Sequence, residues 1–203
     1  MIRIFLKSQL FVIFLITGSI LKADPYSLEN VSHYLTNLKF LKADFLQTSA
    51  DGTASSGAIL IKRPGRMRFE YYKPDKTLVL VSSGALAIFD PKGDEEPITY
   101  PIKNNPISLV LTGEVDLLNS GIVENYEKSI EEAVLTIRDP KKPERGSVEL
   151  VFTGAKPELK QFTIKNENGS STSILLKDIE YPKQINETLF SIALEINKRK
   201  SEN

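Results

Sequence analysis

Arg63 is the residue whose type and position in the sequence could do the most specific chemistry. Downstream of it, Met67, Phe69 and Tyr71 alternate with charged residues, which predicts a strand with one apolar and one solvated face. Counting back by twos from Phe69 places Arg63 on the apolar face, together with Ile61. A guanidinium on that face must find hydrogen-bond acceptors, because burial of an unpaired charge is costly. The alternative is an ordinary arginine at a strand end, with its head group in solvent.

Catalytic chemistry has little support in this sequence. The chain contains one histidine, His33, and no cysteine, so neither a zinc cluster nor a thiol nucleophile is expected. The motifs of nucleotide-binding proteins and serine hydrolases do not occur. Sequence alone leaves open a pair of carboxylates at the separation that sugar cleavage needs, but the acidic residues gather in predicted loops and on solvated strand faces. We therefore expect a protein that is not an enzyme and that holds no metal or cofactor.

Two short helices are predicted beside this strand. In residues 27–38 apolar side chains recur at helical spacing behind Ser27, a suitable N-cap. That apolar stripe consists of Leu28, Val31, Leu35 and Leu38. Residues 107–111 follow an Asn-Pro pair, precede Gly113 and are apolar almost all round, so they must be covered on more than one side. Each helix could serve as a movable cover over an apolar cavity or simply fill a core.

The remainder of the chain has the pattern of antiparallel strands separated by turns. Residues 56–90 hold four short runs of aliphatic, aromatic and β-branched residues divided by Pro-Gly, Pro-Asp and Ser-Gly turns. Further strands are predicted near residues 42–49, 98–102, 122–126, 133–138, 147–152, 161–165, 172–176 and 189–194. A sheet of about eleven strands does not stay flat but curls. A barrel of about eight strands is filled by its own side chains, whereas a wider one leaves room for a ligand. We therefore predict a mainly β (α+β) fold, an incomplete antiparallel β-barrel closed by short α-helices around a hydrophobic cavity.

Residues 1–23 predict a secretory signal peptide. Arg3 and Lys7 precede the apolar run 10–16, and small residues lead to Ala23. An uncleaved anchor is the alternative. Residues 24–203 are then expected to form a single exported domain, a monomer that folds without disulfides in the bacterial periplasm. Removal of the three basic residues of the leader leaves 23 basic against 26 acidic residues, a net charge near −3, which argues against nucleic acid as a partner.

Several of these stretches, taken in order, resemble the periplasmic outer-membrane lipoprotein carrier family, LolA. The matching residues are Gly57, Arg63-Pro64-Gly65-Arg66-Met67-Arg68-Phe69-Glu70-Tyr71, Leu80-Val81-Ser82, Gly84, Phe89-Asp90-Pro91, the upstream run Ala43-Asp44-Phe45-Leu46-Gln47-Thr48, and the downstream Leu159-Lys160-Gln161-Phe162, Gly169 and Thr172. The resemblance covers almost the whole mature chain. The ordered set of motifs, rather than any one of them, makes it specific.

This resemblance implies a carrier that takes acylated lipoproteins from an inner-membrane ABC-type exporter to an acceptor at the outer membrane. It places Leu35, Ile61, Arg63, Met67 and Phe69 in the wall of an acyl-binding cavity. The apolar pattern of this chain adds Val31, Leu80, Phe89, Ile107 and Val110 as cavity residues. We further expect the Arg63 guanidinium to reach backbone carbonyls near residues 107–113 when the cavity is empty, and so to hold a lid segment closed.

Two features depart from the family pattern, and two other functions remain open. The chain has no tryptophan, and a basic tail, Lys198-Arg199-Lys200, follows soon after Phe190, where some relatives carry a longer extension outside the barrel. The same fold could serve as a periplasmic regulatory domain that senses lipoproteins or lipids. Alternatively, a protein of this fold could carry a lipid other than the acyl chains of lipoproteins.

Overall fold

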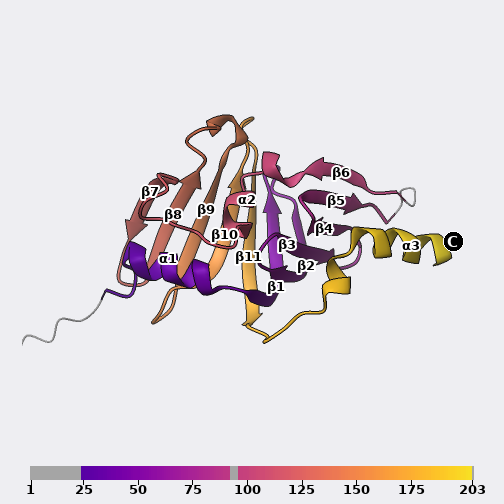
Figure 1. The fold of residues 1–203 in the computed structure, drawn as a ribbon, viewed down its shortest axis with the longest axis horizontal. Helices are drawn as coiled ribbons and strands as arrows, with labels where there is room; N and C mark the ends of the chain where they lie inside the picture. Colours follow the sequence, from indigo (N-terminus) through magenta and orange to yellow (C-terminus); the bar gives the residue numbers. More distant parts are fainter. Residues whose placement is uncertain (1–23, 92–95, 203) are drawn as a thin grey trace, which may run out of the picture.

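The computed structural model describes residues 24–91 and 96–202, and the predicted signal peptide lies outside these residues. Eleven strands within the described residues form one antiparallel sheet (Figure 1), in the order β6-β5-β4-β3-β2-β1-β11-β10-β9-β8-β7. The strands are β1 (Phe40–Ser49), β2 (Ala54–Lys62), β3 (Arg66–Tyr71), β4 (Leu78–Ser82), β5 (Ala85–Phe89), β6 (Ile98–Pro101), β7 (Val123–Lys128), β8 (Glu132–Arg138), β9 (Ser147–Thr153), β10 (Glu158–Lys165) and β11 (Ser171–Glu180).

The sheet is strongly bent but does not close. Strands β6 and β7 stand at opposite ends of the order, while β1 and β11 pair in its middle and join the two halves of the chain (Figure 1). The predicted incomplete antiparallel barrel is therefore confirmed. Hairpins form most of it because each strand follows its neighbour along the chain, as the closely spaced turn residues indicate.

Short helices complete the fold. Helix α1 (Leu28–Asn37) begins at the predicted cap, where the Asn30 amide donates to the Ser27 hydroxyl at 3.2 Å. Helix α2 (Ser108–Leu111) follows the 3₁₀ turn η1 (Ile102–Asn104) and is capped by Ile107 and Thr112. The remaining helical elements are η2 (Pro143–Arg145), η3 (Glu187–Phe190) and α3 (Ile192–Glu202). Figure 1 shows α1 lying across the β7–β11 half of the sheet and α3 at the β4–β6 end.

The prediction of a strand at residues 189–194 is wrong, because this segment contains the end of a 3₁₀ turn and the start of a helix. Ser191 caps the helix, and its hydroxyl accepts a hydrogen bond from the Leu194 amide at 3.2 Å. Ile192 and Ile196, one helical turn apart, pack together on the outer face of the sheet. A short run of aliphatic residues fits both periods, and the pair at helical spacing was the signal that was missed.

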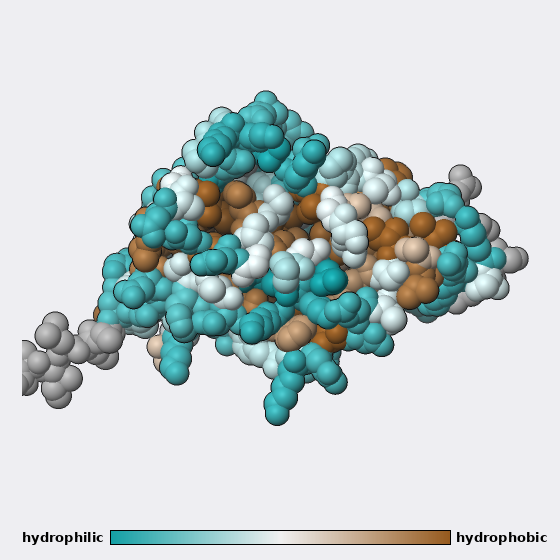
Figure 2. Space-filling view, in the orientation of Figure 1, coloured by the Kyte–Doolittle hydropathy of each residue, from teal (hydrophilic) through white to brown (hydrophobic). Residues whose placement is uncertain are grey.

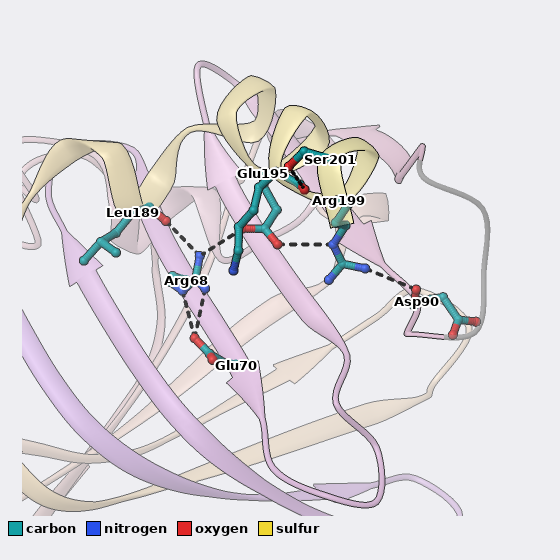
Figure 3. A network of polar contacts seen from close by, with 8 residues as sticks. Arg68, Glu70, Asp90, Leu189, Glu195, Arg199 and Ser201 are labelled. Carbon is teal, nitrogen blue, oxygen red and sulfur yellow. Dashed lines mark hydrogen bonds and ion pairs between the residues drawn. The ribbon is translucent and has the colours of Figure 1, made fainter. Parts of the chain in front are cut away.

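Polar contacts anchor α3 to the sheet (Figure 3). Arg68 of β3 donates to the Leu189 carbonyl at 3.1 Å and lies 4.0 Å from the Glu195 carboxylate. Glu195 accepts from Arg199 at 3.2 Å, one turn further along the helix. The Arg199 guanidinium also stacks over the Phe89 ring, 4.9 Å from its centroid. The basic tail is thus part of a helix packed outside the sheet.

Replacing Gly57 with alanine should destabilise the sheet by about 3 kcal/mol. A Cβ at this position in β2 would lie 2.2 Å from the Glu70 carbonyl oxygen and 2.7 Å from the buried Phe45 ring. Urea unfolding followed by circular dichroism measures the effect. Gly113→Ala is the matched control, since its Cβ would meet only the Pro64 side chain at 3.7 Å. Equal midpoints for the two variants would contradict this assignment.

Candidate functional site

The concave side of the sheet and helices α1 and α2 enclose one apolar interior. Seven of the residues predicted for the cavity are buried in a single cluster there: Val31, Leu35, Ile61, Met67, Phe69, Ile107 and Val110. Helix α1 contributes the stripe that its spacing predicts, with Val31 and Leu35 fully buried and His33 exposed on another side. Helix α2 lies inside this cluster, which explains why its sequence is apolar all round.

The interior is closed in this conformation. The cavity that remains has a volume of about 10 Å³, which is the space of about one water molecule. Its walls are formed by Leu38, Ile61, Arg63, Met67, Ile107, Val110, Leu111, Leu150, Leu159 and Phe162. The hydrophobic cavity expected from the sequence is therefore filled by the covering helices. An acyl chain could enter this covered part of the interior only after α1 or α2 moves away from the sheet.

Arg63 holds the ends of both covering helices. Its side chain is 7% exposed, on the apolar side of the sheet as its register predicts. The guanidinium donates to the Thr112 carbonyl from Nε at 2.9 Å and from Nη2 at 2.5 Å, and to the Leu38 carbonyl from Nη1 at 3.3 Å. Thr112 and Leu38 are the C-caps of α2 and α1. The predicted hydrogen bond to the segment 107–113 is thus present.

The backbone of residues 63–65 also bonds to the ends of both covering helices. The Arg63 amide donates to the Lys39 carbonyl at 2.8 Å, and the Gly65 amide donates to the Leu111 carbonyl at 2.8 Å. We call the β2–β3 turn, residues 63–65, together with its bonds to the two helix ends the Arg63 clasp. Among the described residues, Arg63 has no carboxylate partner within 4.0 Å, so carbonyls and the negative ends of two helices balance its charge. Burial lowers the pKa of Arg63 to about 10, and the group stays protonated at neutral pH.

Two predicted cavity residues, Leu80 and Phe89, lie on the wrong side of the sheet for that role. They form a separate cluster with Leu78 and Ala87 on the outer face, beneath α3. The reason is register, because Leu80 pairs with Arg68, whose side chain belongs to the solvated face of β3. Strand β4 is apolar on both faces, so its own sequence does not distinguish inside from outside.

The sequence pattern did not predict the interior residues from the second half of the sheet. Leu150, Leu159 and Phe162 reach the same interior from β9 and β10. In β9 the apolar residues Val148, Leu150 and Phe152 recur at every second position, and this period-2 signal could have identified Leu150. In β10 Leu159 and Phe162 are three residues apart, because the register shifts between Leu159 and Gln161, so the simple alternation does not reveal that they share a face.

An uncovered apolar surface continues the interior towards one edge of the sheet. The cross-strand row Phe69-Val79-Ile88-Ile98 runs from β3 to β6, and the next row ends at Tyr100. Ile98 and Tyr100 are 59% and 53% exposed. Figure 2 shows hydrophobic surface at this end of the molecule. The apolar lining thus extends beyond the part that the helices cover.

Aromatic side chains strengthen the interior beside Phe69. The Phe45 and Phe69 rings meet edge to face, with centroids 5.3 Å apart, and Phe69 stacks on Tyr71 at 6.5 Å. The Tyr71 hydroxyl donates to the Gln47 side chain at 2.6 Å, and burial raises the pKa of Tyr71 to about 12. The hydroxyl therefore stays neutral, and Tyr71 adds no charge to this boundary of the interior.

Other kinds of site receive no support from the described residues. Residues 24–91 and 96–202 contain no group of three His, Asp or Glu side chains placed to hold a metal ion. Within the same residues no helix combines the length and apolar character that crossing a membrane requires.

These features define a class, a mainly β protein whose incomplete barrel and covering helices enclose an apolar interior. The family model described as outer membrane lipoprotein carrier protein LolA matches residues 36–193, and the chain belongs to this family. The proteins of the family are carriers rather than enzymes. The family implies lipoprotein cargo and a periplasmic location.

Distantly related outer-membrane lipoprotein carrier proteins match most of the chain. The chain is 25% identical over 183 residues to the outer-membrane lipoprotein carrier protein of Coxiella burnetii, which covers 85% of both proteins. It is 29% identical over 170 residues to the corresponding protein of Dechloromonas aromatica, covering 79% of this chain and 80% of the relative. A crystal structure of a LolA superfamily protein from Nitrosomonas europaea aligns with 81% of this chain and 97% of its own, at 10% identity and a TM-score of 0.44.

Proposed function

We propose that this protein is a periplasmic carrier, or chaperone, that shields the acyl chains of lipoproteins between the inner and the outer membrane. The observation that carries the proposal is an apolar interior closed by two helices whose ends meet at one buried arginine. Such an interior can open without unfolding the sheet, since the covering helices are short and the strands pair among themselves. Acyl burial contributes about 0.8 kcal/mol per methylene relative to water, so acyl chains need such an interior to cross the aqueous space between the membranes.

A reconstituted extraction assay tests this function. Inner-membrane vesicles that contain an ABC-type lipoprotein exporter and a labelled lipoprotein are incubated with the purified protein and ATP. We expect the labelled lipoprotein to appear in the soluble fraction as a complex with one copy of the carrier. The control is the same lipoprotein with its acylated cysteine replaced by serine. Equal binding of the acylated and unacylated forms would contradict acyl recognition.

We also propose that residues 1–23 direct export and that residues 24–203 form a single carrier domain that acts as a monomer. The leader pattern of basic residues followed by residues 10–16 supports this reading. Protein recovered from a bacterial periplasm should then begin at Asp24 or within a few residues of it. Intact-mass spectrometry measures this directly, and retention of residues 1–23 in the periplasmic protein would contradict it.

The partners follow from the same proposal. Loading requires an inner-membrane ABC-type exporter, and unloading requires an acceptor at the outer membrane. The closed interior supports a reversible exchange between these partners, because cargo must displace the bonds of Arg63 on entry and these bonds form again on exit.

A further inference from the structure

A large hollow on the described surface lies outside the closed interior. It is a groove of about 680 Å³ between the exposed side of α1, the turn that joins β9 to β10, and the segment after β11. Grooves of roughly 300–1,000 Å³ hold single small ligands. Much of its wall is apolar, with the rings of Tyr34, Phe40 and Tyr181 and the prolines Pro157 and Pro182 among the lining residues. This groove, which we call the α1 groove, is not used by the proposed cargo site.

Its shape is maintained by hydrogen bonds. The hydroxyls of Tyr34 and Tyr181 are 3.1 Å apart, and the Leu159 amide donates to the Tyr34 oxygen at 3.1 Å. The Tyr34 ring also meets the buried Phe152 ring edge to face at 5.8 Å. Burial raises the pKa of both tyrosines, and the hydroxyls therefore remain neutral. The groove is thus formed before any ligand arrives.

The charge of the α1 groove differs from that of the whole protein. Of the described residues that line it, none is Asp or Glu, whereas two are the exposed lysines Lys39 and Lys156. Two acidic residues lie close by, outside the lining: Glu158 beside Tyr181, and Asp24, which is paired with Lys128. The chain without its leader carries a net charge near −3, whereas the lining of this groove carries two exposed lysines and no carboxylate, which favours an anionic ligand.

One residue borders both the α1 groove and the interior. Leu38 lines both, and its carbonyl accepts a hydrogen bond from the Arg63 guanidinium. A ligand in the groove therefore lies directly against the C-terminal end of α1, where the Arg63 clasp is made.

We propose that the α1 groove binds a free long-chain carboxylate, a single acyl chain with one anionic head group. The chain lies on the tyrosine and proline walls, and the carboxylate is held between Lys39 and Lys156. The volume fits one chain, and the lysines select its charge. This site is distinct from the interior that we propose for lipoprotein acyl chains, and it gives the carrier a second, lipid-responsive surface at the end of α1.

Calorimetry with dodecanoate, below its micelle concentration and at neutral pH, tests the proposal. We expect wild-type protein to bind one dodecanoate, and the double variant Lys39→Glu/Lys156→Glu to bind it about tenfold or more weakly, since two attractive charges become repulsive. The control Lys141→Glu/Lys142→Glu makes the same change of net charge on the exposed turn after β8 and should bind as wild type does. Neutral dodecyl maltoside should bind both double variants equally.

A second pair of variants locates the ligand. Ala155→Trp fills the groove and should abolish dodecanoate binding while lipoprotein loading continues. Phe69→Glu, in the interior, should leave dodecanoate binding unchanged. Loss of binding in Phe69→Glu but not in Ala155→Trp would overturn the groove site and leave the carrier function standing. The proposal is also overturned if wild type binds no dodecanoate. This holds even if the groove proves to bind another partner, either vesicles of phosphatidylglycerol or a protein that cross-links to position 155.

Discussion

Lipoprotein loaded onto an Arg63→Leu variant should pass to acceptor membranes roughly ten- to a hundredfold more slowly than from wild type. In the closed conformation Arg63 donates to the carbonyls of Thr112 and Leu38, and these bonds favour the closed state. A hydrogen bond to a charged group contributes roughly 1.5–3 kcal/mol, and about 1.4 kcal/mol corresponds to a factor of ten. Without the bonds, return to the closed state gains less free energy, so the cargo is retained.

The measurement is the rate at which preloaded, labelled lipoprotein moves to outer-membrane vesicles. Arg68→Leu is the matched control, because Arg68 lies on the opposite face of the same hairpin and also donates to a carbonyl, that of Leu189. It should release cargo at the wild-type rate. Arg63→Lys should be intermediate, since a lysine ammonium lacks the planar fork that reaches two carbonyls. Equal rates for Arg63→Leu and wild type would reduce Arg63 to a structural residue.

Phe69→Glu should lower lipoprotein loading by about a hundredfold or more while the sheet still forms. Phe69 is 9% exposed and touches the Phe45 ring inside the interior. A carboxylate at this place must be buried against acyl chains, which costs roughly 3 kcal/mol or more even if protonation removes its charge. Met67→Glu, one alternation earlier on the same strand, should have the same effect.

Soluble complex formation in the extraction assay measures loading, and circular dichroism measures the sheet. Ile130→Glu supplies the matched control, because Ile130 is 94% exposed in the turn between β7 and β8. It should load normally. Normal loading by Phe69→Glu, with an unchanged spectrum, would mean that this side chain does not line the acyl site.

Local patterns predicted the parts of the fold that repeat over short distances. The cap and stripe of α1, the hairpins of residues 56–90 and the inward register of Arg63 all depend on periods of two or 3.6 residues near one another in sequence. The inward orientation of Arg63 was predictable because counting by twos from the apolar residues of the same hairpin places it on their face of the sheet.

Features that depend on distant partners were not predictable in this way. Leu80 and Phe89 face outwards because β4 and β5 are paired in register with β3 and because α3 covers them. Helix α3 was mistaken for a strand, since its aliphatic pair is short and its packing surface is formed by residues a hundred positions earlier. The closed interior and the α1 groove arise from the packing of α1 against the sheet, which no local pattern contains.

The Arg63 clasp joins two helices through one side chain, and this has a consequence for how many acyl chains the protein accepts. Because α1 and α2 share the clasp, opening the interior on both sides requires the guanidinium to give up its bonds to Leu38 and to Thr112. The free energy of breaking the clasp therefore reduces the binding free energy of the first chain alone. Later chains enter an interior that is already open. Uptake should be cooperative, with an affinity that rises steeply from a singly to a triply acylated cargo. Such a threshold would keep single-chain lipids out of the interior and admit lipoproteins, whose chains arrive together.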